Sequence, residues 1–466
     1  MTTRASSAPL ERHTKLLVAG STAGVAAILG ALSIHFLFFL TDVIGLTGAA
    51  AATIMLVGRS FETLVNPIIG VLSDRARSRW GRRRVFVLAG SVPIALATVF
   101  VWNAPNTDAL GAGAAFWWML GALLLFFACQ SFLYLPLSCW VVEMTFDYQE
   151  RTTLSAYSGI GGVFGYLAGA AGFPWIAGQL QPPEMGYRVA ALVIGAIALC
   201  TSLAVGVFLR ERGKAAKRAP TNRPSFREFA STVKNGAFYR LQGSFLVSRI
   251  AFALMASSLP YFCTHWLRTP ALLPKVMTAL IVMVAVCLPL WRRAARNIEK
   301  AKAYALGVLV SAAGASGMLL VGRDSSGAAV LFAGLVGAGV SVHWILPASL
   351  VADAIDVDEQ RTHQRREGLY LAIGATMDRV GHMIATAVLG LGLSYFGYHG
   401  GEEAVPSEDV LFGIRMLLGP LPASLMIASA MLLWKHPINE ATHRAIREEI
   451  DARRSVDMTP HNEAQP

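Results

Sequence analysis

Charged residues are scarce in this sequence: they make up 15% of its 466 residues, while apolar residues make up 54%. The five cysteines stand alone, without a CxxC or Cys/His spacing, and so indicate small core residues instead of a disulfide framework or a metal site. The sequence has no HExxH or GxSxG motif to indicate an enzyme and no GxxxxGK[ST] loop to indicate an ATP-driven pump. It therefore predicts no catalytic residue.

Long apolar stretches dominate the sequence instead. A helix needs about 20 residues to cross a hydrocarbon core of about 30 Å, and such a helix satisfies its own backbone hydrogen bonds. The stretches predict an all-α membrane protein of twelve transmembrane helices, located in the plasma (inner) membrane. The predicted spans are 15–41, 47–73, 85–104, 113–145, 153–178, 188–209, 239–265, 270–290, 303–322, 326–352, 367–397 and 410–434.

Basic residues gather in alternate loops, which predicts the orientation. Six arginines lie in the turn 74–84, between the second and third spans, whereas the loop 398–409 holds four acidic residues and neither lysine nor arginine. Because lysine and arginine are retained in cytoplasmic loops, both termini are expected in the cytoplasm. The formal net charge of +11 is then explained by a basic face toward anionic lipid headgroups, with no nucleic-acid partner.

A repeat divides the chain into two pseudo-symmetric bundles of six helices. Leu135-Pro136-Leu137-Ser138 followed by Glu143 and Arg151-Thr152 corresponds to Leu346-Pro347-Ala348-Ser349 followed by Asp353 and Arg361-Thr362, about 210 residues later. Such duplication is typical of transporters that bind substrate between their halves and work by alternating access. The predicted domains are a first bundle (1–209), a basic cytoplasmic linker (210–238), a second bundle (239–436) and a cytoplasmic tail (437–466), in which we expect a solvated helix without chemistry.

Several motifs resemble one known family. The run from Arg59 to Arg75, continued by Ser78 to Arg84, is similar to the second helix and signature loop of the glycoside-pentoside-hexuronide:cation symporters, a branch of the major facilitator superfamily. The run 41–46 is similar to the end of that family's first helix, and the runs 147–152 and 364–369 are similar to two of its loops. The resemblance covers residues 15–435. It implies the major facilitator fold and secondary active transport of a small organic solute by a monomer.

The charged residues at the cytoplasmic ends of the helices form a candidate gate. Asp74 ends the second predicted span, where its carboxylate can meet the N-terminal end of a helix from the other half, and the arginines that follow can pair with acidic residues of the next loop. The alternative is that these arginines only hold the topology. The expected gating residues are Asp74, Arg75, Arg79, Glu143, Asp147, Glu150, Arg151, Asp353 and Arg361.

Arg59, Glu62 and Asn66 share one face of a single helix, because they are spaced at i, i+3 and i+7. In the family resembled, the positions of Glu62 and Asn66 are usually aspartates that bind the coupling cation. One carboxylate and one amide make a weaker sodium site, which favours a proton on Glu62, with sodium as the alternative. The other interpretation is a static Arg59/Glu62 pair. No cofactor beyond the coupling ion is expected.

At the positions where sugar-transporting members of the family bind their substrate, the residues of this chain differ even more from the family's usual ones. These positions correspond to Ala26, Tyr134 and Gly159, so an apolar or amphipathic substrate, such as a lysolipid, competes with a glycoside. A non-transporting scaffold or sensor is the remaining alternative. The expected substrate-binding residues are Tyr134, Ser138, Tyr157, Arg249, His343, Trp344, Asp378, Arg379 and His382, and among the histidines a hydrogen-bonded core position is the competing interpretation.

Overall fold

The computed structural model describes residues 10–103, 107–145, 147–209, 235–362, 364, 366–400, 406–434, 437 and 440–457. Most of the predicted linker, residues 210–234, lies outside this part of the chain, as does the tail beyond residue 457.

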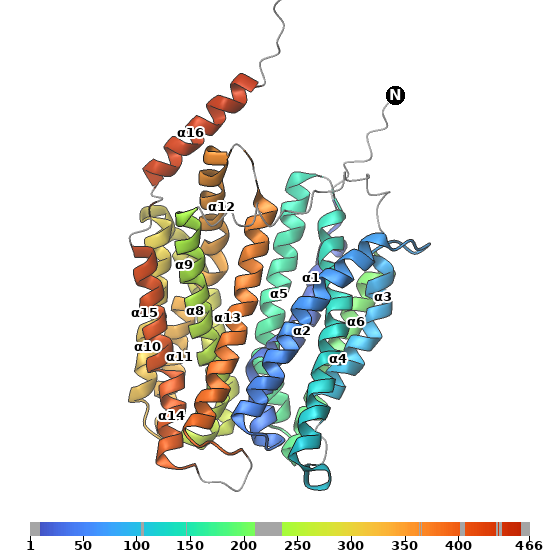
Figure 1. Cartoon of the computed structure of the whole chain (residues 1–466), viewed down its shortest axis with the longest axis vertical. Helices are drawn as coiled ribbons and strands as arrows, with labels where there is room; N and C mark the ends of the chain where they lie inside the picture. Colours follow the sequence, from blue (N-terminus) through green and yellow to red (C-terminus); the bar gives the residue numbers. More distant parts are fainter. Residues whose placement is uncertain are drawn as a thin grey trace, which may run out of the picture.

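A helix occupies each of the twelve predicted spans, and the part of the chain that the structure describes contains no strand (Figure 1). The first bundle comprises α1 (Arg12–Phe38) with the π-helical turn η1 (Phe39–Val43), α2 (Gly48–Arg75), α3 (Arg84–Val101), α4 (Thr107–Glu143), α5 (Tyr148–Ala177) and α6 (Pro183–Phe208). The second comprises α8 (Gly236–Tyr261) with η2 (Phe262–Trp266), η3 (Pro270–Leu272) with α9 (Leu273–Asn297), α10 (Lys300–Gly317) with η4 (Met318–Leu320), α11 (Ser326–Val340) in series with α12 (Val342–Thr362), α13 (Glu367–Tyr395), and α14 (Glu408–Leu418) in series with α15 (Pro420–Trp434). The all-helical fold is thus confirmed.

Helix α13, predicted as the span 367–397, is less apolar than the other spanning helices. Eleven helical segments in the described residues are long and apolar enough to cross a membrane, and α13 is not among them. With 29 residues it is about 43 Å long, which suffices, but Asp378, Arg379 and His382 lie near its middle. Charged residues inside a membrane are rare and usually face a bundle interior or water, so this helix is expected to line the transport path.

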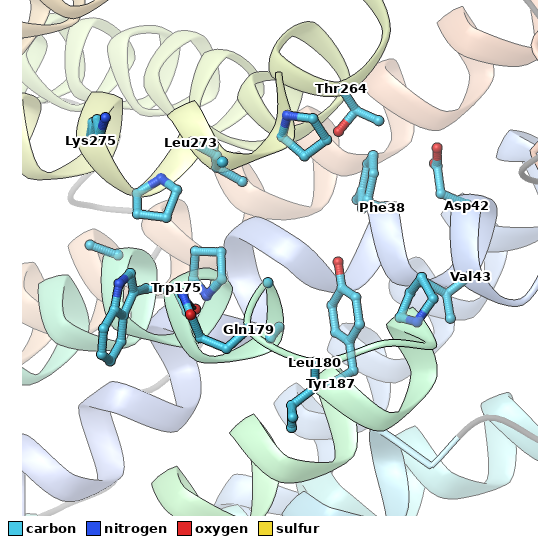
Figure 2. A pocket seen from close by; sticks show the side chains of 18 of the residues that line it. Phe38, Asp42, Val43, Trp175, Gln179, Leu180, Tyr187, Thr264, Leu273 and Lys275 are labelled. Atoms are coloured by element: carbon cyan, nitrogen blue, oxygen red, sulfur yellow. Dashed lines mark hydrogen bonds between the residues drawn. The ribbon is translucent and has the colours of Figure 1, made fainter. Parts of the chain in front are cut away.

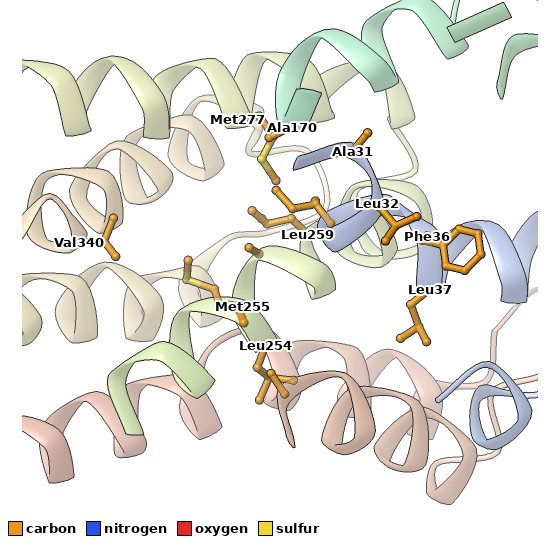
Figure 3. Packing of buried hydrophobic residues seen from close by; sticks show 14 of the residues in the cluster. Ala31, Leu32, Phe36, Leu37, Ala170, Leu254, Met255, Leu259, Met277 and Val340 are labelled. Atoms are coloured by element: carbon orange, nitrogen blue, oxygen red, sulfur yellow. The ribbon is translucent and has the colours of Figure 1, made fainter. Parts of the chain in front are cut away.

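The two bundles pack through a small set of helices. Helices α1 to α6 pack on one another, as do α8 to α15, and the main helix contacts between the bundles are made by α1 with α8, α2 with α13, and α5 with α9 (Figure 1). Figure 3 shows Leu32 and Phe36 of α1 together with Leu254 and Leu259 of α8 in one buried cluster. The hydrophobic core is therefore continuous across the interface.

We call the end of the molecule that carries the turns 74–84 and 292–302 the basic end, and the other the opposite end. An additional helix, α16 (Glu440–Asp457), lies at the basic end beside α12 (Figure 1). A solvated helix was expected here from the sequence, but one face of the helix is buried. Ile446 and Ile450 are buried against Val357 of α12, because these apolar side chains are four residues apart on one face of α16.

At the opposite end two glycines let α2 and α13 approach closely. A Cβ atom on Gly48 would lie 2.5 Å from the carbonyl oxygen of Gly390, and one on Gly390 would lie 2.4 Å from the carbonyl oxygen of Gly48. The amide of Ala49 donates a hydrogen bond of 2.8 Å to the hydroxyl of Ser394 next to this contact. Close packing of backbone on backbone thus closes the interface here.

Replacing Gly390 with valine should separate α2 from α13, because the new side chain would overlap the backbone of Gly48. We expect uptake of the substrate to fall at least about tenfold, since a bundle pair that cannot close this end cannot complete the transport cycle. Spin labels on the two helices should report a longer distance at the opposite end. The matched control is Gly121→Val on α4, where a Cβ would meet nothing within 4 Å, and equal loss of uptake in both variants would contradict the argument.

Candidate functional site

The predicted cluster on α2 forms around a buried ion pair. Arg59 Nη1 lies 3.1 Å from Glu62 Oε2, and the exposed fractions of the two side chains are 13% and 8%. Arg59 also donates a hydrogen bond of 3.1 Å to the hydroxyl of Ser33 on α1, and its guanidinium lies 4.9 Å from the ring centre of Phe127 on α4. Asn66 lies one turn nearer the basic end and is half-buried. The guanidinium of Arg59 therefore already occupies the cation position next to Glu62.

A second charged cluster faces the first from the other bundle. Arg249 Nε on α8 lies 3.2 Å from Asp378 Oδ1 on α13, and the guanidinium of Arg249 lies 5.9 Å from the ring centre of Trp344. The charges of Asp378, Arg249 and Arg59 all act on His382. Residues from α2, α8 and α13 therefore converge on one region between the bundles.

The candidate His343 and another histidine, His35, are core residues. His35 Nε2 lies 2.7 Å from the carbonyl oxygen of Ala170 and the ring stacks on Phe173. His343 is 5% exposed, with Nδ1 3.0 Å from the carbonyl oxygen of Val340 and Nε2 3.0 Å from the hydroxyl of Ser248. Both rings hold helices of their own bundle together, whereas His382 faces the charged clusters.

The other expected substrate-binding residues differ in their surroundings. Tyr134 is 37% exposed, and the charges of Arg379 and Glu62 both act on its hydroxyl, so it lies between the two clusters. Ser138 donates a hydrogen bond of 2.8 Å to the carbonyl oxygen of Leu135 in its own helix, and Tyr157 is half-buried. A Cβ on Gly159 would meet nothing within 4 Å.

At the basic end, charged residues of the first bundle form a network with Arg83 at its centre. Arg83 donates hydrogen bonds to Asp74 and, at 3.2 Å, to Glu143, and Arg82 donates one of 2.9 Å to Glu143. Burial by itself would lower the pKa of Arg83, but the hydrogen bond and the charge of Glu143 raise it above its ordinary value. The network joins the end of α2, the start of α3 and the end of α4.

The second bundle repeats this arrangement with fewer residues. Lys300 at the start of α10 lies 2.7 Å from Asp353 on α12. The repeat predicts the correspondence of Asp353 with Glu143, and each carboxylate accepts from a cation at the start of the third helix of its half. Each bundle therefore ties its third and fourth helices together at the basic end.

The remaining gating candidates have separate positions. Asp147 caps α5 by accepting a hydrogen bond of 2.8 Å from the amide of Glu150, whose carboxylate lies 3.2 Å from Lys15 Nζ. Arg79 lies 5.7 Å from the ring centre of Trp80, and Arg361 is exposed. Glu143 thus pairs with Arg82 and Arg83 instead of Arg75 or Arg79, and the side chain of Arg151 lies outside the described residues.

The sequence analysis missed a third polar cluster, at the opposite end. His265 Nε2 lies 2.7 Å from Asp42 Oδ1, and Tyr398, after α13, donates a hydrogen bond of 2.6 Å to the same oxygen. Burial and the Asp42 carboxylate raise the pKa of Tyr398 above its ordinary value, which keeps its hydroxyl protonated as a donor. Only the resemblance of the run 41–46 pointed to Asp42. The equivalence of Asp42 and His265 becomes visible only in the fold, where each lies in the π-helical turn that ends the first helix of its bundle, because their separation of 223 residues differs from the offset of about 210 of the sequence repeat.

A cavity of about 1850 Å³ lies beside this cluster, between the end of α5, the start of α6 and the start of α9 (Figure 2). Asp42 and His265 both contribute to its wall, together with Phe38, Trp175 and Tyr187. The cluster is therefore adjacent to a large space at the opposite end.

Comparison with known proteins decides the family. The model of the MFS/sugar transport protein family matches residues 19–440. The chain belongs to this family. The glycoside-pentoside-hexuronide:cation symporter assignment made from the motifs is confirmed.

Three relatives of this MFS transporter are similar along nearly their whole length. An uncharacterized symporter of Synechocystis sp. is 28% identical over 94% of this chain and 96% of its own. The sodium-dependent lysophosphatidylcholine symporter 1-A of Danio rerio is 24% identical (88% and 82%), and a glucuronide carrier protein homolog of Escherichia coli is 25% identical (91% and 92%). The chain is thus a multi-pass membrane transporter and not an enzyme.

A solved structure supports the same fold. The bacterial homolog of the human lysosomal transporter Spinster, in an inward-facing and unoccupied conformation, superimposes with a TM-score of 0.67 at 14% identity and covers 94% of this chain and 97% of its own. At this identity the likeness shows the fold alone.

The network around Arg83 predicts the effect of removing Asp74 from this transporter. Asp74→Ala should lower uptake at least about tenfold while expression and substrate binding stay within about twofold, because the end of α2 loses its tie to α3 and only the interconversion of states is disturbed. Uptake by proteoliposomes and equilibrium binding to purified protein measure the two effects. The matched control is Asp324→Ala, an exposed carboxylate at the opposite end, and normal uptake by Asp74→Ala would rule out the gating role.

Proposed function

We propose that this MFS transporter is a proton-coupled symporter for an amphipathic organic solute that carries an anionic group. The observation that carries the proposal is that two ion pairs, Arg59/Glu62 on α2 and Arg249/Asp378 on α8 and α13, lie on helices that form the interface of the two bundles, with Arg379 beside Asp378 in the chain. Three guanidinium groups near one region of the interface suit an anion, because arginine binds carboxylates and phosphates through two parallel hydrogen bonds.

Exposure of charge in the interface supports alternating access. The side chain of Asp378 is 44% exposed although it lies near the middle of α13, and a carboxylate at that depth requires water. At the opposite end, Gly48 and Gly390 bring α2 and α13 into backbone contact. We infer that water reaches Asp378 from the basic end, which the loop charges predict to face the cytoplasm.

The walls of the interface favour an amphipathic substrate over a neutral sugar. Ala26 and Gly159 offer no polar side chain, and Tyr134 offers one hydroxyl on an aromatic ring. A glucuronide and a lysophosphatidylcholine, which the names of two relatives mention, share an anionic group on a bulky organic body. A lysolipid is therefore the second candidate, favoured by the aromatic and apolar character of Tyr134 and Trp344.

The Arg59/Glu62 pair offers a direct way to couple a proton to an anion. While Glu62 is ionised, its carboxylate neutralises Arg59 at 3.1 Å. When Glu62 takes up a proton, the positive charge of Arg59 is released toward the anionic group of the substrate. Proton and substrate then bind more tightly together than alone, and by linkage each raises the affinity for the other equally.

Sodium fits this site less well. A sodium ion needs several hard oxygen ligands with net negative charge, and this face of α2 offers one carboxylate and one amide with a guanidinium between them. The sodium-dependent relatives make sodium the ion that a coupling experiment has to exclude. A scaffold without transport is disfavoured, because charged pairs inside the membrane are energetically unfavourable and a scaffold does not need them.

Simple galactosides should bind poorly. Because Ala26, Tyr134 and Gly159 occupy the sugar-binding positions, we expect a dissociation constant no better than millimolar, about −4 kcal/mol. Isothermal titration calorimetry of purified protein measures this, with a glucuronide and a lysophospholipid as comparison ligands. Micromolar binding of a neutral galactoside would restore the sugar symporter.

Glu62→Gln should abolish accumulation driven by protons, because the amide holds no titratable proton. The measurement is uptake into proteoliposomes under a pH gradient and, separately, under a sodium gradient. We expect the wild type to accumulate substrate under the pH gradient. The variant should only exchange substrate down its own gradient, and its net accumulation should be lower at least about tenfold. Glu299→Gln is the control, since Glu299 is a carboxylate at the basic end that pairs with Lys302. Accumulation driven by sodium alone, or an unchanged response in Glu62→Gln, would show that the coupling site is elsewhere.

A further inference from the structure

The first helix of each bundle ends in a π-helical turn at the same position of the repeat. The turn η1 (Phe39–Val43) follows α1, and the turn η2 (Phe262–Trp266) follows α8. A shift of 223 residues superimposes the two ranges and places Asp42 on His265. Short π-helical turns are rare and frequently mark functional sites. The two turns bring these equivalent residues from opposite bundles into contact at 2.7 Å.

The Asp42 carboxylate is held from both bundles. Thr41 donates a hydrogen bond of 2.7 Å to Oδ2 from the same turn and lies 2.8 Å from the hydroxyl of Tyr261 in α8. Tyr398 donates to Oδ1 and lies 2.8 Å from His265 Nε2, which closes a triangle between the three side chains. The exposed fractions of Asp42 and His265 are only 11% and 13%, so the pair is formed in a largely desolvated place.

The surroundings allow a proton to reach the pair. Asp42 and His265 both line the cavity of about 1850 Å³ at the opposite end, and Figure 2 shows Asp42 beside Phe38 and Thr264 at its edge. The tyrosine hydroxyls near the pair stay neutral at ordinary pH. The titratable and charged groups that face the pair or share its cavity are Tyr187 and Glu184 of α6, Tyr261 of α8, Tyr398 after α13, Arg268 between η2 and η3, and Lys275 of α9.

We propose that Asp42, His265 and Tyr398 form a proton-binding site between the bundles, which holds the opposite end closed while a proton is bound. With His265 protonated, an imidazolium and a carboxylate compensate each other across the interface. When the proton leaves, Asp42 keeps its charge in a desolvated site, and no other cation among the described residues forms an ion pair with it, so that separation of the bundles hydrates it. The closed state therefore binds the proton more tightly than the open state.

This difference fixes the direction of the pH dependence. Because the closed state binds more protons, the ratio of closed to open molecules rises as the pH falls and decreases as the pH rises. One proton changes that ratio by at most tenfold per pH unit. The site is separate from Glu62, so it adds a pH-dependent step to the cycle whichever ion Glu62 couples.

The test follows the distance between the bundles at the opposite end in the full-length protein reconstituted in lipid nanodiscs. Spin labels replace Leu180 in the first bundle and Asp324 in the second, in a chain whose native cysteines are replaced, and their distance distribution is recorded from pH 5.5 to 8.5. We expect the closed fraction, relative to the open one, to fall at least about tenfold over this range. His265→Gln, which keeps a hydrogen-bond donor but cannot titrate, should reduce the change to within about twofold, and Asp42→Asn should do the same.

Two controls separate this site from other titrating groups. His443→Gln changes a histidine of α16 that lies 3.1 Å from Asp356 at the basic end, and it should leave the pH response intact. Glu62→Gln should also keep the response, even where it abolishes proton-driven uptake. A wild type without a pH response, a full response in His265→Gln or Asp42→Asn, or loss of the response in Glu62→Gln would each overturn the proposal.

Discussion

The structure depends on one constraint, namely that a charge inside a membrane must meet an opposite charge or water. Hydrocarbon cannot solvate a carboxylate or a guanidinium, so each such group near the middle of the bundles has its position decided by its partner. Arg59 lies against Glu62 and Arg249 against Asp378. These pairs lie on the surfaces that the bundles turn toward each other, and the apolar faces of the same helices are free to contact lipid or pack in the core.

The same constraint explains why two ends of one interface are built differently. At the opposite end, small residues and buried polar contacts bring the bundles together, through Gly48 with Gly390 and through Asp42 with His265. At the basic end, the networks of Arg83 and of Lys300 each lie within a single bundle. A bundle with its own internal ties can rotate as a rigid body, which is what alternating access about a central site requires.

The fold could be predicted from the sequence because it follows from the length of apolar stretches, a local property. The charged helix α13 was found in the same way, since its flanks are apolar even though its middle is not. Local reasoning could not predict which residues pair in space. Glu143 binds Arg82 and Arg83 because the turn after α2 folds back. Helix α16 packs on α12 because Ile446 and Ile450 contact Val357. The pairing of Asp42 with His265 joins residues 223 positions apart, a separation that differs from the offset of about 210 of the sequence repeat.

The composition of α13 has a consequence for how the protein is made. A segment with aspartate, arginine and histidine at its centre partitions weakly into a bilayer by itself, at an unfavourable free energy of about 2.5 to 3.5 kcal/mol for each central charge. Helix α8, which carries Arg249, is synthesised more than a hundred residues earlier and is already in place when α13 emerges from the ribosome. The Arg249 guanidinium can then form its ion pair with the Asp378 carboxylate as α13 inserts into the membrane. An earlier helix of the second bundle thus assists the insertion of a later one, and a charge that serves the cycle in the finished molecule first serves its biogenesis.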